Sequence, residues 1–75
     1  MNELHQKFPA ILRRKEVEKR IGLSKSSIYD RLNRRSPRFD ATFPKPVKLG
    51  VNAIGFVEFE VGEWISARIN AREAQ

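Results

Sequence analysis

The short polar and basic residues after Gly22 are the part of the sequence best suited to chemistry. Ser24 is a typical helix N-cap residue, because its hydroxyl accepts a hydrogen bond from an amide two or three residues further on. Ile28 and Leu32 lie four residues apart and predict the buried side of a helix over about Ser24–Arg34. The side chains expected to point outward are Lys25, Ser26, Tyr29, Asn33 and Asp30. Short donors and acceptors near a helix start suit base edges and phosphates, so this segment is predicted to be a DNA recognition helix.

Further arginines extend this prediction beyond the start of the helix. Arg31 and Arg34 suit guanine or backbone oxygens. Arg34, Arg35 and Arg38 lie in the loop between helix and hairpin and could cross the same track of phosphates. The alternative stays open that these arginines only solvate a surface and that Tyr29 packs against the rest of the protein.

A β-hairpin is predicted after this loop. Prolines at 44 and 46 push their predecessors toward extended geometry. The segments 47–49 and 54–57 predict two short strands around a four-residue loop, 50–53. Lys45 and Lys48 would place positive charge on this hairpin, beside the recognition helix, or they would be merely solubilising lysines.

Two further helices complete the expected domain. The first runs over about 14–21 and ends at Gly22, where a left-handed cap costs least. The link 22–24 then gives helix-turn-helix spacing. The last helix starts near 58–60 and runs to about Ala71. Ile11-Leu12 is interpreted as a plug in the core and not as a strand. Phe56, Val61, Trp64 and Ile65 are predicted core residues, and Phe39 or Phe43 is expected to cover the hairpin base.

Composition excludes several classes of protein. Seventy-five residues make one domain with a small core, here assigned to 10–75 after a loosely ordered arm, 1–9. There is no cysteine, and the single histidine, His5, has no obvious partner for acid–base or metal chemistry. Neither a phosphate-binding loop nor metal-ligand spacing is present. We therefore expect no enzyme, no cofactor, no metal site and no small-molecule substrate. Without a signal peptide or a run of ~20 apolar residues, the protein is expected to be soluble and cytoplasmic, with no membrane partner.

Charge is distributed unevenly along the chain. Residues 13–48 contain twelve basic and four acidic residues, a balance of +8, whereas residues 57–75 contain two basic and four acidic residues, a balance of −2. The first twelve residues cancel, which gives the net charge of +6. A basic block beside a mildly acidic tail indicates that one face meets a polyanion.

An ordered set of motifs resembles the AlpA family of small prophage-type transcriptional regulators, which are close to excisionases and to MerR-like winged-helix domains. The segments that carry the resemblance are ILR at 11–13, EV at 16–17, GLSKSSIY at 22–29, FPKPVKLG at 43–50, EV at 60–61 and WI at 64–65. The resemblance covers about residues 10–70. Where the family usually has tryptophan–arginine after the wing glycine, this chain has Phe56 and Val57, so one phosphate contact is lost. The loop over 34–42 is also longer than usual, and its arginines could compensate.

The resemblance implies a mainly α fold with a small β-hairpin, a winged helix-turn-helix. It implies that the helix from Ser24 enters the major groove of double-stranded DNA and that the Lys45–Phe56 hairpin is the wing. The residues assigned to DNA are Arg14, Ser24, Lys25, Ser26, Ser27, Tyr29, Arg31, Arg34, Arg35, Lys45 and Lys48. Cooperative self-association on DNA is a further expectation. Two alternatives remain, an excisionase-like factor that bends DNA and an adaptor whose basic block binds an acidic protein.

Overall fold

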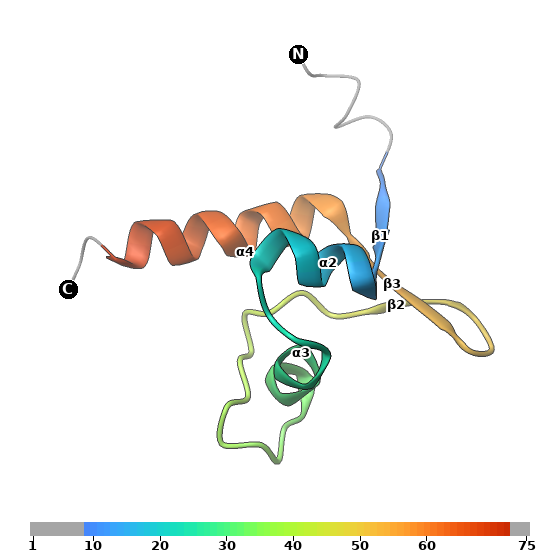
Figure 1. The fold of residues 1–75 in the computed structure, drawn as a ribbon, viewed down its shortest axis with the longest axis horizontal. Coiled ribbons are helices and arrows are strands. Elements are labelled where there is room, and N and C mark those ends of the chain that lie inside the picture. Colours follow the sequence, from blue (N-terminus) through green and yellow to red (C-terminus); the bar gives the residue numbers. More distant parts are fainter. Residues whose placement is uncertain (1–8, 73–75) are drawn as a thin grey trace.

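Six elements follow one another along residues 9–72, the part of the chain that the computed structural model describes (Figure 1). They are β1 (Ile11–Arg13), α2 (Arg14–Ile21), α3 (Lys25–Leu32), β2 (Val47–Gly50), β3 (Ala53–Val57) and α4 (Glu58–Ala71). In Figure 1, α4 lies along the top, α3 lies at the bottom, and the β2–β3 hairpin extends to the right. His5 and all of the predicted arm except Pro9 lie outside the described residues.

The sheet has three strands in the order β1-β3-β2, and both pairings are antiparallel. Ile11 and Leu12 therefore form part of a strand. The prediction that this pair only plugs the core, without forming a strand, was wrong. Leu12 lies opposite Phe56 in the ladder, and the amide of Glu58 donates to the carbonyl of Ala10 at 2.8 Å. A two-stranded hairpin of this size is only marginally stable, so a third strand supplies hydrogen bonds that the hairpin lacks. Over residues 9–72 the fold is thus a mixed α/β domain of three helices and a small sheet.

Gly55 allows β1 and β2 to approach β3 on the outer face of the sheet. A Cβ atom at this position would collide with Cγ2 of Ile11 and would come within 3.1 Å of Cδ1 of Leu49. Both side chains therefore close over the glycine from the two neighbouring strands. Since a side chain here would separate the strands, the sheet requires glycine at this position.

The hairpin loop is shorter than predicted. β2 reaches Gly50 and β3 begins at Ala53, which leaves Val51 and Asn52 as a two-residue turn in place of the expected 50–53 loop. Gly50 pairs with Ala53, and the register shifts between Lys48 and Gly50. This irregularity leaves Leu49 without an opposite partner, as in a β-bulge.

The turn between α2 and α3 follows the sequence prediction closely. Gly22 has φ 72° and ψ 24°, the left-handed conformation, and its amide donates to the carbonyl of Glu18. The hydroxyl of Ser24 accepts the amide of Ser27 at 3.2 Å, which caps α3. Both signals are local, so neighbouring residues suffice to specify them.

α3 ends at Leu32, two residues earlier than predicted. Asn33 has extended geometry, with φ −90° and ψ 113°, and its side-chain oxygen accepts the amide of Arg35 at 3.0 Å. Asparagine competes for backbone hydrogen bonds in this way and commonly ends helices. Arg34 therefore lies in the loop with Arg35, as the predicted loop over 34–42 has it, whereas the prediction that the recognition helix reaches Arg34 was wrong.

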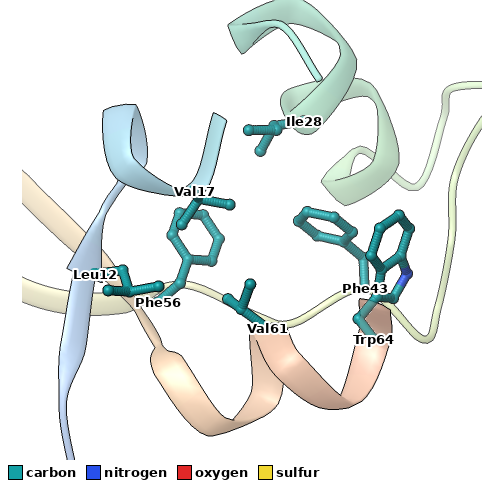
Figure 2. Close-up of a cluster of buried hydrophobic side chains, with 7 residues drawn as sticks. All are labelled: Leu12, Val17, Ile28, Phe43, Phe56, Val61 and Trp64. Carbon is teal, nitrogen blue, oxygen red and sulfur yellow. The ribbon is translucent and has the colours of Figure 1, made fainter. Parts of the chain in front are cut away.

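One core joins all three helices to the sheet (Figure 2). Its buried residues are Leu12, Val17, Ile28, Phe43, Phe56, Val61 and Trp64. The predicted core positions 56, 61 and 64 are confirmed, and Ile65 packs against the cluster while partly buried. Of the two phenylalanines in question, Phe43 covers the hairpin base, with its ring centroid 5.1 Å from that of Trp64 in an edge-on arrangement. Phe39 remains 40% exposed.

α4 is the longest helix of the described part, with fourteen residues. Its predicted range is confirmed. Glu58 and Glu60 lie in the first turn and Arg68 in the last, as the helix dipole favours. Within residues 9–72, none of the helices combines the length and the apolar character that spanning a bilayer needs.

Gly22 generates the first testable prediction. Gly22→Ala should lower the free energy of unfolding by about 1 kcal/mol, because alanine is strained at positive φ. Urea denaturation followed by Trp64 fluorescence measures this change. Gly50→Ala is the matched control, since its Cβ meets nothing within 4 Å and its φ is not positive. Equal effects of the two substitutions would contradict the role given to the left-handed cap.

Candidate nucleic-acid interface

The polar side of α3 faces solvent. Ile28 is fully buried and fixes the rotation of the helix, which turns Lys25, Ser26 and Tyr29 outward. Tyr29 remains 40% exposed, and Lys25 and Ser26 are also exposed. Donors and acceptors on the first two turns of the helix are therefore free to meet another molecule.

A hollow separates α3 from the tip of the hairpin. It is lined by Arg13, Arg14, Lys15, Tyr29, Asn52 and Ile54. The three consecutive basic residues come from the junction of β1 and α2, whereas Asn52 is in the two-residue turn of the hairpin. The sheet and two helices thus contribute to one concave surface, and its basic side comes from residues at this junction.

A second hollow continues this surface along α2. It is lined by Arg14, Lys15, Glu18, Lys19, Leu23 and Lys25. Arg14 and Lys15 line both hollows, so the two are adjacent. We refer to Arg13, Arg14, Lys15, Lys19, Lys25, Tyr29 and Asn52 together as the basic surface.

Few cations of the basic surface are paired with acidic side chains. Arg14 pairs with Glu18 at 2.6 Å, and both side chains are about one quarter exposed. The other four cations, at 13, 15, 19 and 25, form no ion pair within residues 9–72. Four uncompensated charges on a concave surface attract an anion with several charges.

The structure brings together only part of the predicted site. Arg14, Lys25 and Tyr29 are on the basic surface, and Ser26 is exposed on the same side of α3. Ser24 and Ser27 instead hydrogen-bond each other through their hydroxyls at 3.2 Å and form the cap. Their side chains are therefore largely occupied by the fold.

Arg31 lies on the other flank of α3. Its Nη1 atom donates to the carbonyl of Ser27 at 3.3 Å, and its own carbonyl accepts the amide of Asp40. The side chain is partly buried and belongs to neither hollow. Its contacts are with the helix and the following loop.

The remaining predicted cations are spread around the basic surface. Arg34, Arg35 and Lys45 are exposed but line neither hollow. Lys48 pairs with Ile54 across the hairpin, so the two side chains share a sheet face. Because Ile54 lines the hollow beside Tyr29, Lys48 lies on the face of the hairpin that is turned toward α3.

Sequence reasoning missed Arg13, Lys15, Lys19 and Asn52. The sequence did contain a signal for Arg13, Lys15 and Lys19. Residues 13–15 are a run of basic residues, and Lys19 lies four residues after Lys15, on the same face of the helix. Asn52 gave no such signal, because its place near Tyr29 depends on how the hairpin packs.

Arg20 is the basic residue of α2 that is most strongly engaged by acids. It pairs with Glu58 at 2.8 Å and with Glu16 at 3.2 Å, which links α2 to the start of α4. The hydrogen bond to Glu58, followed by that to Glu16, raises the pKa of its guanidinium. Arg20 therefore joins helices and adds no free charge to the basic surface.

Asp40 fastens the loop after α3 to α4. Its carboxylate accepts the indole Nε1 of Trp64 at 3.0 Å and the amide of Thr42 at 2.9 Å. Burial opposes its ionisation, but the hydrogen bonds from Thr42 and Trp64 and the charge of Arg68 outweigh this effect and lower the pKa of Asp40. The loop is thereby held where Phe43 can enter the core.

The arrangement as a whole is suited to holding a polyanion. Within the described residues, no group of three histidine, aspartate or glutamate side chains could hold a metal ion. The exposed side chains of the basic surface are ammonium, guanidinium, phenol and amide groups. These are donors for phosphates and base edges.

Comparison with known proteins gives two matches. Residues 10–69 match the family model described as "Prophage CP4-57 regulatory protein (AlpA)". The chain is also 50% identical over 58 residues to the "DNA-binding transcriptional activator AlpA" of Escherichia coli (strain K12), which covers 77% of this chain and 83% of that protein. No solved structure matches the chain.

The contact between Asp40 and Trp64 generates the second prediction. Asp40→Ala should lower the free energy of unfolding by ~1–3 kcal/mol, because it leaves the indole N–H without a partner. Asp40→Asn should cost less near neutral pH. Urea denaturation at several pH values measures both effects.

The pH dependence follows from the lowered pKa of Asp40. The ionised carboxylate adds stability that is fully present above its unfolded pKa, about 4, and is lost as the pH falls through the folded value. Below about pH 4, the free energy of unfolding of Asp40→Asn should therefore fall less steeply than that of the wild type. Asp30→Ala, which breaks only the exposed pair with Arg38, is the control and should cost less than ~1 kcal/mol. An acid transition unchanged in Asp40→Asn would contradict this role.

Proposed function

The chain belongs to the AlpA family of prophage regulatory proteins, and we propose that it regulates transcription by binding double-stranded DNA. It is a homologue of a transcriptional activator and not of an enzyme. As a regulator of this kind, it would act on the nucleoid in the bacterial cytoplasm. The observation that carries the proposal is the exposed polar side of α3 beside four unpaired cations of the basic surface, all within the described residues.

In this proposal the fold works as a winged helix-turn-helix. α2 and α3 form the helix-turn-helix, and α3 enters the major groove, which is wide enough for one helix. Lys25, Ser26 and Tyr29 lie on the outward side of its first turns and would meet base edges. Recognition by the N-terminal part of the second helix is the usual geometry of this motif.

The β2–β3 hairpin serves as the wing. Its turn at Val51-Asn52 projects past the hollow beside Tyr29, and Lys48 is on the side facing α3. The wing would lie along the phosphate backbone or the minor groove next to the major groove that α3 occupies. Arg13 and Lys15, at the base between wing and helix, would neutralise the phosphates between the two grooves.

This geometry changes the relative weight of the predicted contacts. Arg31 faces the loop and donates to its own helix, so we assign it to support of α3 more than to base recognition. Arg34 and Arg35, beyond the end of α3, would reach flanking phosphates only. Specificity would then depend on Ser26 and Tyr29, and affinity on the lysines and arginines of the basic surface.

The third prediction concerns affinity. Lys15→Ala and Lys48→Ala should each weaken binding to all duplexes alike and should reduce the slope of log affinity against log salt by about one unit. Fluorescence anisotropy with labelled duplex at several salt concentrations measures the slope. Arg72→Ala, at the far end of α4, removes one charge outside the basic surface and is the matched control. A slope that is unchanged in Lys15→Ala and reduced in Arg72→Ala would contradict the proposed orientation.

The fourth prediction concerns specificity. Duplexes selected from a random pool by the wild-type chain supply a preferred site and a scrambled one. Tyr29→Ala should reduce discrimination between the two by ~1–3 kcal/mol, because it removes a side chain that would touch base edges. Phe39→Ala removes a ring of equal exposure from the loop and should leave discrimination unchanged. If discrimination survives Tyr29→Ala and Ser26→Ala together, α3 is not the recognition helix.

A further inference from the structure

α4 carries a second face that the core does not use. Val61 and Trp64 point into the core (Figure 2). Another stripe lies about 120° around the helix from Val61, and it consists of Phe59, Gly62, Ser66 and Ile69. Phe59 is 64% exposed and Ile69 is 47% exposed. Large apolar side chains that line up in solvent on one helix face indicate a contact with another molecule.

The order of these residues is symmetric about Trp64. Phe59 and Ile69 lie five residues to either side of it, and Gly62 and Ser66 lie two residues to either side. In an antiparallel pair of α4 helices centred there, Phe59 of one copy would meet Ile69 of the other, and Gly62 would meet Ser66. Such a contact satisfies the rule for a two-fold interface, in which residue i meets j and j meets i.

The centre of this stripe leaves room for close approach. A Cβ atom added to Gly62 would meet nothing within 4 Å, so the space above it is open. Serine, at position 66, is also small, and its hydroxyl can hydrogen-bond within its own helix. Small residues at the crossing point allow two helices to pack at the short end of the usual separation, about 8–10 Å. Phe59 and Ile69 at the two ends would then cover the contact.

The helix dipoles favour the antiparallel arrangement. In an antiparallel pair the positive N-terminus of each α4 lies beside the negative C-terminus of the other, whereas a parallel pair sets like ends side by side. Arg68 takes no part in this contact, because its guanidinium lies over the Trp64 ring, 5.5 Å from the ring centroid, on the core side of α4.

We propose that this stripe of α4 is a self-association surface whose partner is a second copy of the chain, packed antiparallel. Ile28 of α3 and Val61 of α4 point toward one another across the core (Figure 2). The stripe is therefore turned away from the side of α4 that faces α3. Two copies can then meet through α4 while each keeps the polar side of its α3 exposed.

The interface is small, and its strength depends on concentration. One helix per copy is at the low end of specific protein interfaces, which bury about 1,200–2,000 Å². The dimer is therefore weak in dilute solution and forms when two copies are held near each other on DNA, where the effective concentration is high. This behaviour is cooperative self-association with a defined surface. Self-association on DNA rests on the proposed function, whereas the contact between two α4 helices does not.

Disulfide trapping tests the contact without DNA. The chain has no cysteine, so single variants report one position each. Mixing Gly62→Cys with Ser66→Cys under mild oxidation should give a mixed disulfide faster than either variant gives a disulfide with itself, because only the mixed pair is opposed in the antiparallel register. Faster crosslinking of Gly62→Cys with itself would overturn this register. Crosslinking of the mixed pair no faster than that of Gly62→Cys with Ala67→Cys, which is off the stripe, would overturn the surface.

A long duplex should accelerate the same crosslink. It holds several copies near each other, so adding it should raise the rate of the 62–66 disulfide by ~10-fold or more over protein alone. The pair of Gly62→Cys with Ala67→Cys is again the control, because it measures chance encounters along the duplex. A duplex that slows the 62–66 disulfide, or that speeds it no more than the control, would overturn self-association on DNA.

A bulky substitution tests the same step without a covalent bond. Gly62→Gln should weaken binding to the long duplex by ~10-fold, because a long side chain blocks the contact between copies. Its affinity for a short duplex that holds one copy should stay within about twofold of wild type, since this side chain does not disturb the monomer. Ala67→Gln is the matched control and should bind both duplexes normally. Equal affinity of wild type and Gly62→Gln for a long duplex that both bind would overturn self-association on DNA.

The outcomes separate this inference from the proposed function. A preferred 62–66 disulfide in a chain without any affinity for duplex would support the surface on α4 and would overturn the proposed function. Tight binding to duplex without a preferred 62–66 disulfide would support the proposed function and would overturn the surface on α4.

Discussion

Burial of Ile28 is the interaction on which the arrangement of the proposed site depends. α3 has only eight residues, too few to hold a helical conformation by propensity alone, so its orientation comes from packing. Because Ile28 is fully buried in the shared core, α3 has one permitted rotation. That rotation turns Lys25 and Tyr29 toward α2 and the hairpin, and Arg31 toward the loop. The identity of the outward side chains therefore follows from one apolar contact.

Ion pairs then determine which cations serve the fold and which remain free to attract an anion. Arg20 is engaged by two glutamates and Arg14 by one, while Lys15, Lys19 and Lys25 have no acidic partner among the described residues. Exposed ion pairs such as these contribute little stability. Their main consequence is to determine which cations remain unpaired and can attract an anion. Asp40 acts differently, because it takes an indole N–H from Trp64 and holds a loop that adds Phe43 to the core.

How far the sequence predicts the structure depends on the range of each interaction. The bounds of α2, the left-handed Gly22 and the Ser24 cap follow from contacts within four residues, and all three were predictable. β1 was not, because Ile11–Arg13 is a strand only through pairing with β3, more than forty residues away. The Asp40–Trp64 contact and the place of Asn52 beside Tyr29 are likewise tertiary. Of the proposed site, the face of α3 and Arg14 were thus predicted, whereas the place of the hairpin turn beside them was not.

The uneven charge of the chain has a spatial counterpart in the fold. The basic surface comes from β1, α2, α3 and the hairpin turn, whereas three of the chain's nine acidic residues lie in the first two turns of α4. The shared core separates α3 from α4, so a small domain can present a polyanion-binding side and a partly apolar side at once. If acidic residues were mixed into the first side they would repel phosphates, and if basic residues covered the second they would draw DNA over it. In the proposed orientation on DNA, segregation therefore leaves the exposed stripe of α4 free, which is the condition that contact between copies on DNA requires.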